Sequence, residues 1–298
     1  GFIGKGARLS VAAQDLSQVP ELLSQQVVLV REDESGRVLE ATGVQLPGAL
    51  DDLYAAAEGE EALGATAHAG KTGFRLWAPT ARTVSLCLHA DGDGRAISRQ
   101  NMHRNDSTGI WSATLEEDLS GHYYTYLVEV FVTGVGMVRN RVTDPYSVSL
   151  TMDSLRSYVV DLGAPALKPE GWEQTAFPQK VAAQTDMSIY ELHVRDFSIG
   201  DATVSVPNRG KYLAFTEADS NGMRHLAALS AAGLTDVHLL PVFDFATVPE
   251  AGCVTPEVPD APPDSLQQQA AVMAVAAQDC FNWGYDPSHF NAPQGNYA

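Results

Sequence analysis

Between residues 63 and 163, hydrophobic and polar residues alternate in short segments, which is the pattern of β-strands with one face buried. Val84, Leu86 and Leu88 share one face of such a segment, and a similar alternation runs through residues 124–132. Turn residues separate the segments, and no helical period lies between them. Closely spaced strands of this kind predict an Ig-like β-sandwich that fills one domain.

The first 62 residues predict a linker or accessory region with two local elements. Residues 16–26 predict a short helix. Residues 27–45 predict a β-hairpin, because two β-branched runs flank a turn at Ser35 and Gly36.

Residues 164–185 hold several prolines and mostly polar side chains, so they predict a connection between domains. After this connection the pattern changes. Residues 186–198 predict a buried strand, a helix begins at Ser220 or Asn221, and residues 236–242 predict a second buried strand. Strand, helix and strand in this order predict a βαβ unit with parallel pairing.

From Asp244 onward the sequence predicts no further strand, only a proline-rich loop, a short helix near residues 266–277 and an aromatic, turn-rich segment at 282–298. Residues 186–298 are fewer than half of the roughly 250 that a closed (β/α)8 barrel needs. An open parallel pair leaves an unpaired apolar edge. We therefore expect this last segment to be incomplete or to rest on something outside the chain.

The net charge of −18 comes from 37 acidic against 19 basic residues. This excess of acid argues against nucleic acid as a partner, because binding to phosphates needs clustered lysine and arginine. It suits a neutral ligand better. No apolar run is long enough to span a bilayer, since the longest, at 270–277, has the length of a core helix. The first residues show no signal-peptide pattern, and a chain that had already been cleaved would look the same.

The three cysteines are too few for a disulfide scaffold, and their spacing fits no zinc motif. Cys253 and Cys280 flank the proline-rich loop and the short helix, so they would pair in an oxidising compartment. Cys87 falls within a strand pattern and predicts a small buried apolar side chain.

Five segments between residues 74 and 290 resemble one family in their order along the chain, and the resemblance as a whole runs from about residue 16 to the end. The first two are FRLWAPTARTVSLCL (74–88) and GHYYTYLVEVFV (121–132). The other three are YELHVRDFS (190–198), GLTDVHLLPVFDF (233–245) and NWGYDPSHF (282–290). Together they resemble the bacterial pullulanases and plant limit dextrinases, which are debranching enzymes of the alpha-amylase superfamily.

The resemblance implies a starch-binding-type β-sandwich followed, in 186–298, by the first βαβ of a (β/α)8 TIM barrel. It implies a retaining glycoside hydrolase that cleaves α-1,6-glucosidic branch linkages in pullulan, amylopectin and limit dextrins. Such chemistry needs two carboxylates roughly 5–5.5 Å apart. The family places them on later barrel strands, beyond residue 298, so we expect this chain alone to be inactive.

The resemblance also implies the partners, the cofactors and the location of the enzyme. The expected partners are α-glucans, namely pullulan, starch, limit dextrin and maltooligosaccharides, together with the remainder of the barrel. No cofactor is required, although structural calcium ions are common in the family, and the sequence places no calcium site. The expected location is secreted, periplasmic or at the surface of a bacterial cell.

The candidate site residues follow from the same resemblance. Tyr285 is expected to lie against a sugar ring, because a flat aromatic face matches the apolar face of a pyranose; packing at the barrel rim is the alternative. Asp286 is expected to bond sugar hydroxyls or to hold the Tyr285 loop in place; capping of the turn before Pro287 is the alternative. Trp283 and Asn282 would form a further wall or be structural, and Phe243 would contact sugar at the rim or pack in the core.

Two tryptophans of the sandwich, Trp77 and Trp111, would stack on glucose units as a platform, or be buried as tryptophans of sandwiches often are. His193, Arg195 and Asp196 suggest a catalytic or metal site at first sight. No nucleophile elbow or second ligand at metal spacing accompanies them, so a supporting role for the first strand is the better hypothesis.

Two other functions compete with the hydrolase. One is a non-catalytic α-glucan-binding module, which should not carry the exposed sheet edge expected here. The other is a structural or interaction protein whose open edge is covered by a partner chain.

Overall fold

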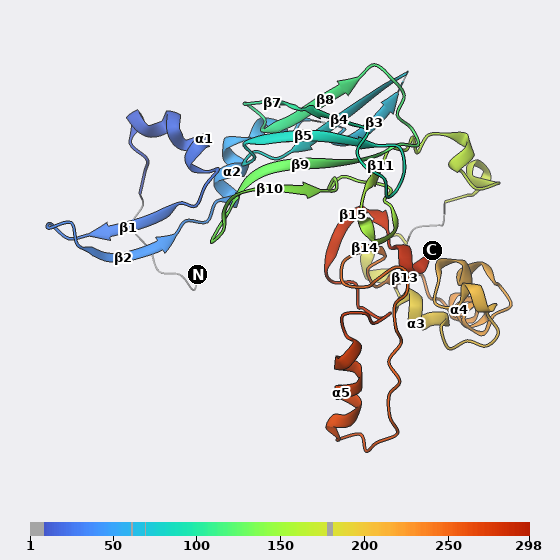
Figure 1. Cartoon of the computed structure of the whole chain (residues 1–298). Helices are drawn as coiled ribbons and strands as arrows, with labels where there is room; N and C mark the ends of the chain where they lie inside the picture. Colours follow the sequence, from blue (N-terminus) through green and yellow to red (C-terminus); the bar gives the residue numbers. More distant parts are fainter. Residues whose placement is uncertain (1–8, 61, 69, 178–180) are drawn as a thin grey trace. The chain divides into compact units, whose positions relative to one another are not determined.

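The computed structural model describes residues 9–60, 62–68, 70–177 and 181–298. The chain forms two compact units, Gly1–Asp144 and Pro145–Ala298, and each is described by itself (Figure 1).

The first unit begins with two short helical turns, η1 (Ala13–Gln18) and α1 (Val19–Leu22), at the place where a helix was predicted. The predicted hairpin is confirmed as β1 (Val28–Glu32) paired antiparallel with β2 (Val38–Gly43). Asp33 fixes its turn, because Oδ1 accepts hydrogen bonds from the backbone N–H of Ser35 (2.9 Å) and of Arg37 (3.0 Å). Two more short helices follow, α2 (Pro47–Leu53) and η2 (Ala55–Ala57).

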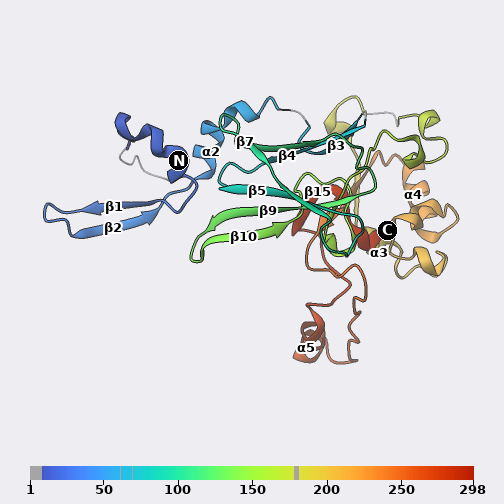
Figure 2. The same cartoon turned by 45° about the horizontal axis from the view of Figure 1, so that its top comes forward.

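The predicted sandwich is confirmed as two antiparallel sheets, which lie as two layers in Figures 1 and 2. One sheet has the order β3 (Gly64–His68), β4 (Lys71–Trp77), β8 (Ile110–Leu115) and β7 (His103–Asn105). The other has the order β10 (Gly136–Val142), β9 (Tyr123–Val132), β5 (Thr83–His89) and β6 (Ser98–Asn101).

Buried aromatic rings join the two layers of the sandwich. Phe74 of β4 and Tyr124 of β9 meet edge to face, with ring centroids 5.0 Å apart. The hydroxyls of Tyr124 and Tyr126 donate to Oδ2 of Asp144, at 2.9 and 3.1 Å. Asp144 is fully buried, and burial raises the pKa of the Tyr126 hydroxyl well above its ordinary value. This polar contact satisfies both tyrosine hydroxyls inside an apolar core.

The second unit starts with irregular chain and several single helical turns. The strand expected at the end of the sandwich, in 157–162, is only two residues long, β11 (Ser157–Tyr158). It ends early because residues 161–163 form a turn, in which the Asp161 carboxylate accepts from the N–H of Gly163 at 2.8 Å. The helical turns of this region are η3 (Met152–Ser154), η4 (Pro165–Leu167), η5 (Trp172–Gln174) and η6 (Gln184–Asp186).

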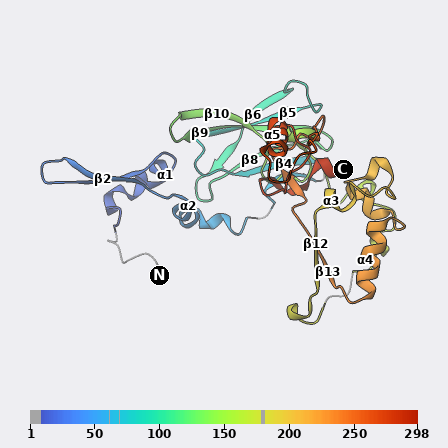
Figure 3. The ribbon, with the colours of Figure 1, turned by 90° about the horizontal axis from the view of Figure 1, so that it is seen from below.

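The predicted βαβ unit is present, with β12 (Ile189–Leu192) and β13 (Asp236–Leu239) paired in parallel. Figure 3 shows the two strands side by side with α4 (Asn221–Ala231) running along them. The Ser220 hydroxyl caps this helix by accepting from the N–H of Met223 at 3.3 Å. The short helices α3 (Val194–Ser198), η7 (Val206–Asn208) and η8 (Tyr212–Thr216) precede α4.

Both strands are shorter than predicted, for local reasons. β12 stops at Leu192 because the ring of His193 accepts from the N–H of Asp196 (3.4 Å) and so caps α3. β13 stops at Leu239, two residues before Pro241, which has no N–H to donate to a strand ladder. The expected apolar edge is present, since Ile189 and other apolar side chains of the two strands are exposed.

The prediction of no further strand after Asp244 is wrong. The segment β14 (Phe243–Phe245) pairs antiparallel with β15 (Pro287–Pro293), and Asp244 lies opposite His289. Prolines occupy both ends of β15, so their missing N–H groups weaken its strand signal without interrupting its middle. The short turn η9 (Gly295–Tyr297) follows.

The helix expected near 266–277 forms as α5 (Leu266–Val275), but none of its residues is buried. Its apolar sequence therefore does not mark a core helix in this structure. The core of the second unit lies elsewhere, around Val194, Phe245, Val248 and Tyr297.

Candidate functional site

The segment 281–290, which we call the aromatic loop, presents three large aromatic side chains to solvent. The exposed fractions are 57% for Trp283, 72% for Tyr285 and 67% for Phe290. Exposed aromatic rings gathered within eight residues are unusual for a surface that binds nothing. The aromatic loop is therefore the candidate ligand-binding site of this unit.

A network of polar side chains holds the aromatic loop to the chain that follows β14. Asn282 donates from Nδ2 to the Thr247 hydroxyl (2.7 Å), and that hydroxyl donates to Oδ2 of Asp286 (2.5 Å). Asn282 also accepts from the N–H of Gly284 through Oδ1, at 2.7 Å. Because these bonds fix the loop on both sides of Tyr285, the ring is presented by an ordered backbone rather than a free one.

Gly284 is needed at its position for two reasons. Its φ of +84° lies in the left-handed region, which favours glycine. A Cβ there would also lie 2.9 Å from the Cβ of Pro241 and 3.2 Å from the ring of Phe245. The loop can therefore approach the core closely only with glycine beside Tyr285.

His193 supports the aromatic loop through a hydrogen bond and ring contacts. Its Nε2–H donates to the carbonyl of Asn282 at 3.0 Å, with the Tyr297 hydroxyl 3.1 Å from the same nitrogen. Its ring also packs against the rings of Phe281 and Trp283, with centroids 5.5 and 6.1 Å away. Both ring nitrogens are engaged by the chain itself, so His193 supports the aromatic loop and caps α3, whereas its sequence context predicted support of the first strand.

Burial raises the pKa of two neighbouring tyrosines, Tyr212 and Tyr297. The hydroxyl of Tyr212 donates to the carbonyl of Val242 at 2.9 Å, and burial raises its pKa to about 12. Burial, with the neighbouring Tyr212 and Asp196 adding to the effect, raises the pKa of Tyr297 to about 12 as well. Both hydroxyls therefore stay protonated at neutral pH; that of Tyr212 donates to Val242, and that of Tyr297 accepts from the Nε2–H of His193.

A buried carboxylate lies next to the loop, on β14. Oδ2 of Asp244 is 2.6 Å from Nδ1 of His289 and accepts from the Ser154 hydroxyl at 2.9 Å. The serine bonds the carboxylate and not the imidazole, so the three residues do not form the relay of a serine hydrolase. They connect β14, β15 and the 148–156 segment.

A second carboxylate, Glu250, holds the same segment. Its oxygens accept from the N–H of Asp153 (2.6 Å) and of Gly295 (3.1 Å). Burial raises the pKa of Glu250, and the nearby Asp244 and Asp153 carboxylates raise it further. Asp244, Glu250 and the 148–154 segment line a cavity of about 290 Å³.

The structure brings some of the expected site residues together. Phe243 is half-buried, and its ring centroid lies 5.1 Å from that of Phe290, so the two form one aromatic contact. Asp286 accepts from the Thr247 hydroxyl and so holds the loop of Tyr285 in place. Phe290 was not singled out from the sequence, and its only sequence signal is its place within the motif of Trp283 and Tyr285.

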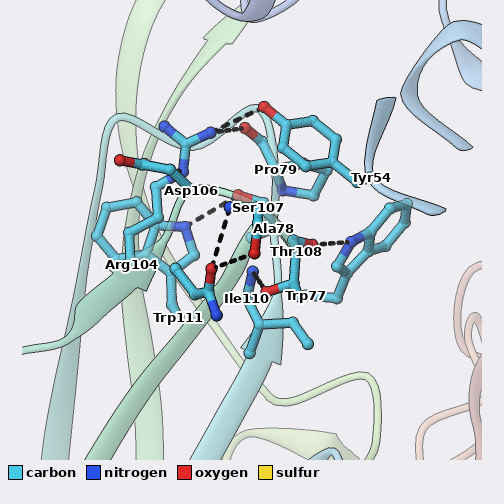
Figure 4. A network of polar contacts seen from close by, with 11 residues as sticks. Tyr54, Trp77, Ala78, Pro79, Arg104, Asp106, Ser107, Thr108, Ile110 and Trp111 are labelled. Carbon is cyan, nitrogen blue, oxygen red and sulfur yellow. Dashed lines mark hydrogen bonds and ion pairs between the residues drawn. The ribbon is translucent and has the colours of Figure 1, made fainter. Parts of the chain in front are cut away.

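The two sandwich tryptophans differ (Figure 4). Trp111 is 6% exposed and donates its indole N–H to the carbonyl of Ala78 at 3.0 Å, so it is a core residue and not a platform. Trp77 is half-buried and donates to the carbonyl of Thr108 at 3.0 Å. Next to them, Arg104 donates to the hydroxyl of Tyr54 at 2.9 Å, as Figure 4 shows.

Cys253 and Cys280 form a disulfide, which closes the segment that contains α5. Backbone hydrogen bonds beside it join Val254 to Gln278 (2.6 Å) and Cys280 to Val254 (3.3 Å). Cys280 directly precedes the aromatic loop, so the disulfide fixes the start of that loop. Cys87 is buried and unpaired with another cysteine, and burial raises the pKa of its thiol.

In the part of the chain that the structure describes, no group of three or more His, Cys, Asp or Glu side chains is arranged to hold a metal ion. The described residues therefore contain no candidate site of this kind for the calcium ion that the family resemblance suggests. None of the helices among the described residues has the length and apolar character needed to cross a bilayer.

Comparison with known proteins decides what the chain is related to. It is 38% identical to a pullulanase of Klebsiella pneumoniae over 95% of the chain, and 37% identical to the chloroplastic Pullulanase 1 of Arabidopsis thaliana over 94%. The chain is related to the N-terminal region of pullulanases. It spans 30% and 29% of the length of these two relatives.

The structure agrees with this relationship. A crystal structure of the Klebsiella pneumoniae pullulanase complexed with maltotriose matches 94% of the chain, with a TM-score of 0.81 and 37% identity, and the chain covers 30% of that protein. Residues 62–147 match the family described as carbohydrate-binding module 48 (isoamylase N-terminal domain). Residues 2–52 match the pullulanase N2 domain, within the region predicted as linker or accessory.

Proposed function

We propose that the chain is the substrate-approach part of a retaining glycoside hydrolase that cleaves α-1,6-glucosidic linkages in pullulan, amylopectin and limit dextrins. The observation that carries this proposal is the aromatic loop, in which an exposed Tyr285 is held by hydrogen bonds on both sides. A pyranose ring offers an apolar face of C–H groups, which stacks on such an aromatic surface. Because the chain is related to pullulanases, the ligand that we expect is an α-glucan.

In this proposal β12, α4 and β13 form the first βαβ of a (β/α)8 barrel. The exposed apolar side chains of the parallel pair support it, because barrel strands are buried on both faces in the closed barrel. The remaining strands would cover Ile189 and Val237. The same exposure argues against an independent glucan-binding module.

We further propose that this chain alone does not hydrolyse glucan. A retaining enzyme needs two carboxylates that face the scissile bond. Two acids near the aromatic loop already have other partners. The buried Asp244 bonds His289 and Ser154, and the half-buried Glu250 bonds backbone N–H groups.

The disulfide between Cys253 and Cys280 supports an oxidising compartment, and we propose a secreted, periplasmic or surface-exposed enzyme. We propose no required cofactor, because acid–base and nucleophilic carboxylates suffice for this reaction.

Titration of the chain with maltotriose tests the role of the aromatic loop. Tyr285→Ala should weaken binding about tenfold or more, in line with the loss of one stacking surface. The matched control is Phe177→Ala, because Phe177 is 97% exposed and lies outside the loop. Equal affinity of the two variants would contradict the proposed subsite, and release of maltotriose from pullulan by the purified chain would contradict the proposed inactivity.

A further inference from the structure

One face of the sheet formed by β10, β9, β5 and β6 is turned away from the sandwich core, and we call it the outer face. Leu86 and Leu88 of β5 are buried in the core, so Ser85 and Cys87, which alternate with them, point to the outer face. Arg99 of β6 lies opposite Cys87. Because residues directly opposite each other in a ladder share a face, Arg99 also belongs to the outer face.

A second arginine lies on the outer face, at its other margin. Leu127 of β9 lies opposite Ser85 of β5 and opposite Arg141 of β10. Arg99 and Arg141 are therefore on the same face, with β5 and β9 between their strands (Figure 3). Three strand spacings place the two backbones about 14 Å apart.

Neither of these two guanidinium groups has a hydrogen bond or an ion pair among the described residues, and both side chains are exposed. By contrast, Arg139 of the same face is paired with Glu129 at 2.8 Å. Burial raises the pKa of the Cys87 thiol, and the positive charges of Arg99 and Arg141 partly oppose this rise, so both charges act on the middle of the face. The outer face thus carries two uncompensated positive charges in a chain whose net charge is −18.

The segment 254–279, which we call the arm, has the opposite charge. It belongs to the second unit, lies between the two cysteines of the disulfide, and contains four acidic residues and no basic residue. Glu257, Asp260 and Asp264 are exposed, and none of them pairs with a cation in the part of the chain that the structure describes. No residue of α5 is buried, and Figures 1 and 2 show α5 set apart from the other elements of its unit.

The arm is ordered although it is exposed. The disulfide between Cys253 and Cys280 closes its base. Within the arm, Gln268 of α5 donates from Nε2 to the carbonyls of Pro259 (3.3 Å) and Ala261 (3.1 Å), which holds the acidic, proline-rich stretch against the helix. A segment that is already ordered loses less conformational entropy when it binds.

The spacing of the acidic side chains matches that of the two arginines. Asp260 and Asp264 are four residues apart, so an extended chain places them up to about 14 Å apart. This distance equals the separation of the strands that carry Arg99 and Arg141. One arm can therefore offer a carboxylate to each arginine at the same time.

Exposed apolar side chains accompany the charges on both surfaces. Met137 is exposed on the outer face, where it lies opposite Phe131 of β9. Leu266 and Met273 of α5 are exposed on the arm. Apolar contact combined with complementary charge is the composition of a surface that binds another protein.

We propose that the outer face of one copy of the chain binds the arm of a second copy, with the carboxylates of Asp260 and Asp264 paired to the guanidinium groups of Arg99 and Arg141. This self-association goes beyond the proposed function and does not depend on it. The net charge of each copy opposes association at long range. At an ionic strength of about 0.15 M, charges more than about 8 Å apart are largely screened, so the close pairs decide the outcome.

Reversal of the charges on each surface tests this contact. The face variant carries Arg99→Glu and Arg141→Glu, and the arm variant carries Asp260→Lys and Asp264→Lys. All four side chains are exposed, so the fold is retained, and circular dichroism checks this. Arg95→Glu is the matched control, because Arg95 is an exposed arginine of the same unit that lies between β5 and β6, outside the outer face.

Light scattering during gel filtration measures the mass at this ionic strength, from about 10 μM to about 1 mM protein, the range in which small contacts form. We expect the mass of the wild-type and Arg95→Glu chains to rise above 31.9 kDa with concentration. The dissociation constant should increase at least tenfold in the face variant and in the arm variant. The arm variant is less negative than the wild type, so a general loss of repulsion would have the opposite effect.

An equimolar mixture of the face and arm variants should associate again, because each reversed surface then meets one of opposite charge. Three results would overturn the proposal: no association of the wild-type chain, association that survives both reversals, or no recovery in the mixture. Association that survives both reversals would belong to another surface, such as the exposed apolar edge of β12 and β13. Where a reversal unfolds the sheet, Arg99→Gln with Arg141→Gln should give the same loss.

Discussion

Nδ1 of His289 lies 2.6 Å from Oδ2 of Asp244, and both side chains are almost completely shielded from solvent. The same unit contains a second His–carboxylate pair, His238 and Glu191, at 3.1 Å with both side chains more than half exposed. The two pairs therefore differ mainly in burial, and they provide a matched comparison of what burial adds to such a contact.

Asp244→Ala should lower the free energy of unfolding by about 3 kcal/mol or more, because it removes an acceptor from a buried imidazole and from the Ser154 hydroxyl. Glu191→Ala should lower it by at most about 1 kcal/mol, since an exposed pair is screened by water. Denaturant unfolding of the two variants measures the difference. Similar losses would show that burial is not what makes the Asp244 contact strong.

Thr247→Val should weaken maltotriose binding without unfolding the chain. The change keeps the shape of the side chain but removes the hydroxyl that joins Asn282 to Asp286 across the aromatic loop. We expect a three- to tenfold rise in the Kd for maltotriose, the usual effect of one to two hydrogen bonds. Thr216→Val is the control, because it removes a hydroxyl that donates to the carbonyl of Leu213, outside the aromatic loop. Equal effects of the two changes would show that the network does not order the loop.

Asp201→Asn should reduce stability at neutral pH but not near pH 2. Hydrogen bonds from Thr203, through its side chain and its backbone, lower the pKa of the Asp201 carboxyl to about 2, and Gly222 and Asn221 contribute further bonds. A lowered folded-state pKa means that the stabilisation is complete above the unfolded-state value of about 3.9 and is lost as the pH falls through about 2.

Thermal unfolding of the wild-type and Asp201→Asn chains between pH 7 and pH 2 measures this effect. Their melting temperatures should differ most at neutral pH and converge on acidification. A difference that does not change with pH would contradict the linkage of Asp201 ionisation to stability.

Replacing both Cys253 and Cys280 by serine should lower the free energy of unfolding by about 3 kcal/mol, the value expected for a closed loop whose ends are 27 residues apart. The same loss should follow from adding a thiol reductant to the wild-type chain, whereas the double variant should not respond to reductant. Cys87→Ala serves as the control, since Cys87 is buried and takes no part in the disulfide. A reductant effect that persists in the double variant would exclude the disulfide as its cause.

Local patterns predicted the sandwich, the hairpin and the βαβ unit, because alternation and caps lie within a few neighbouring residues. They did not predict β15 or the contact of His289 with Asp244, since these partners are 45 residues apart and prolines obscure the strand. The aromatic loop was found through family resemblance and not through periodicity. The burial of Trp111 and the solvent exposure of α5 depend on tertiary packing, which no local pattern specifies.

The segment that carries α5 leaves the rest of the chain at Cys253 and returns at Cys280, with a covalent bond at its base and no buried residue in its helix. A protease that cuts once within this segment would therefore not separate the two halves of the chain. The aromatic loop would stay attached to β13 and β14 through sulfur rather than through the backbone. The disulfide therefore keeps the aromatic loop in place after a cleavage that would otherwise divide the chain.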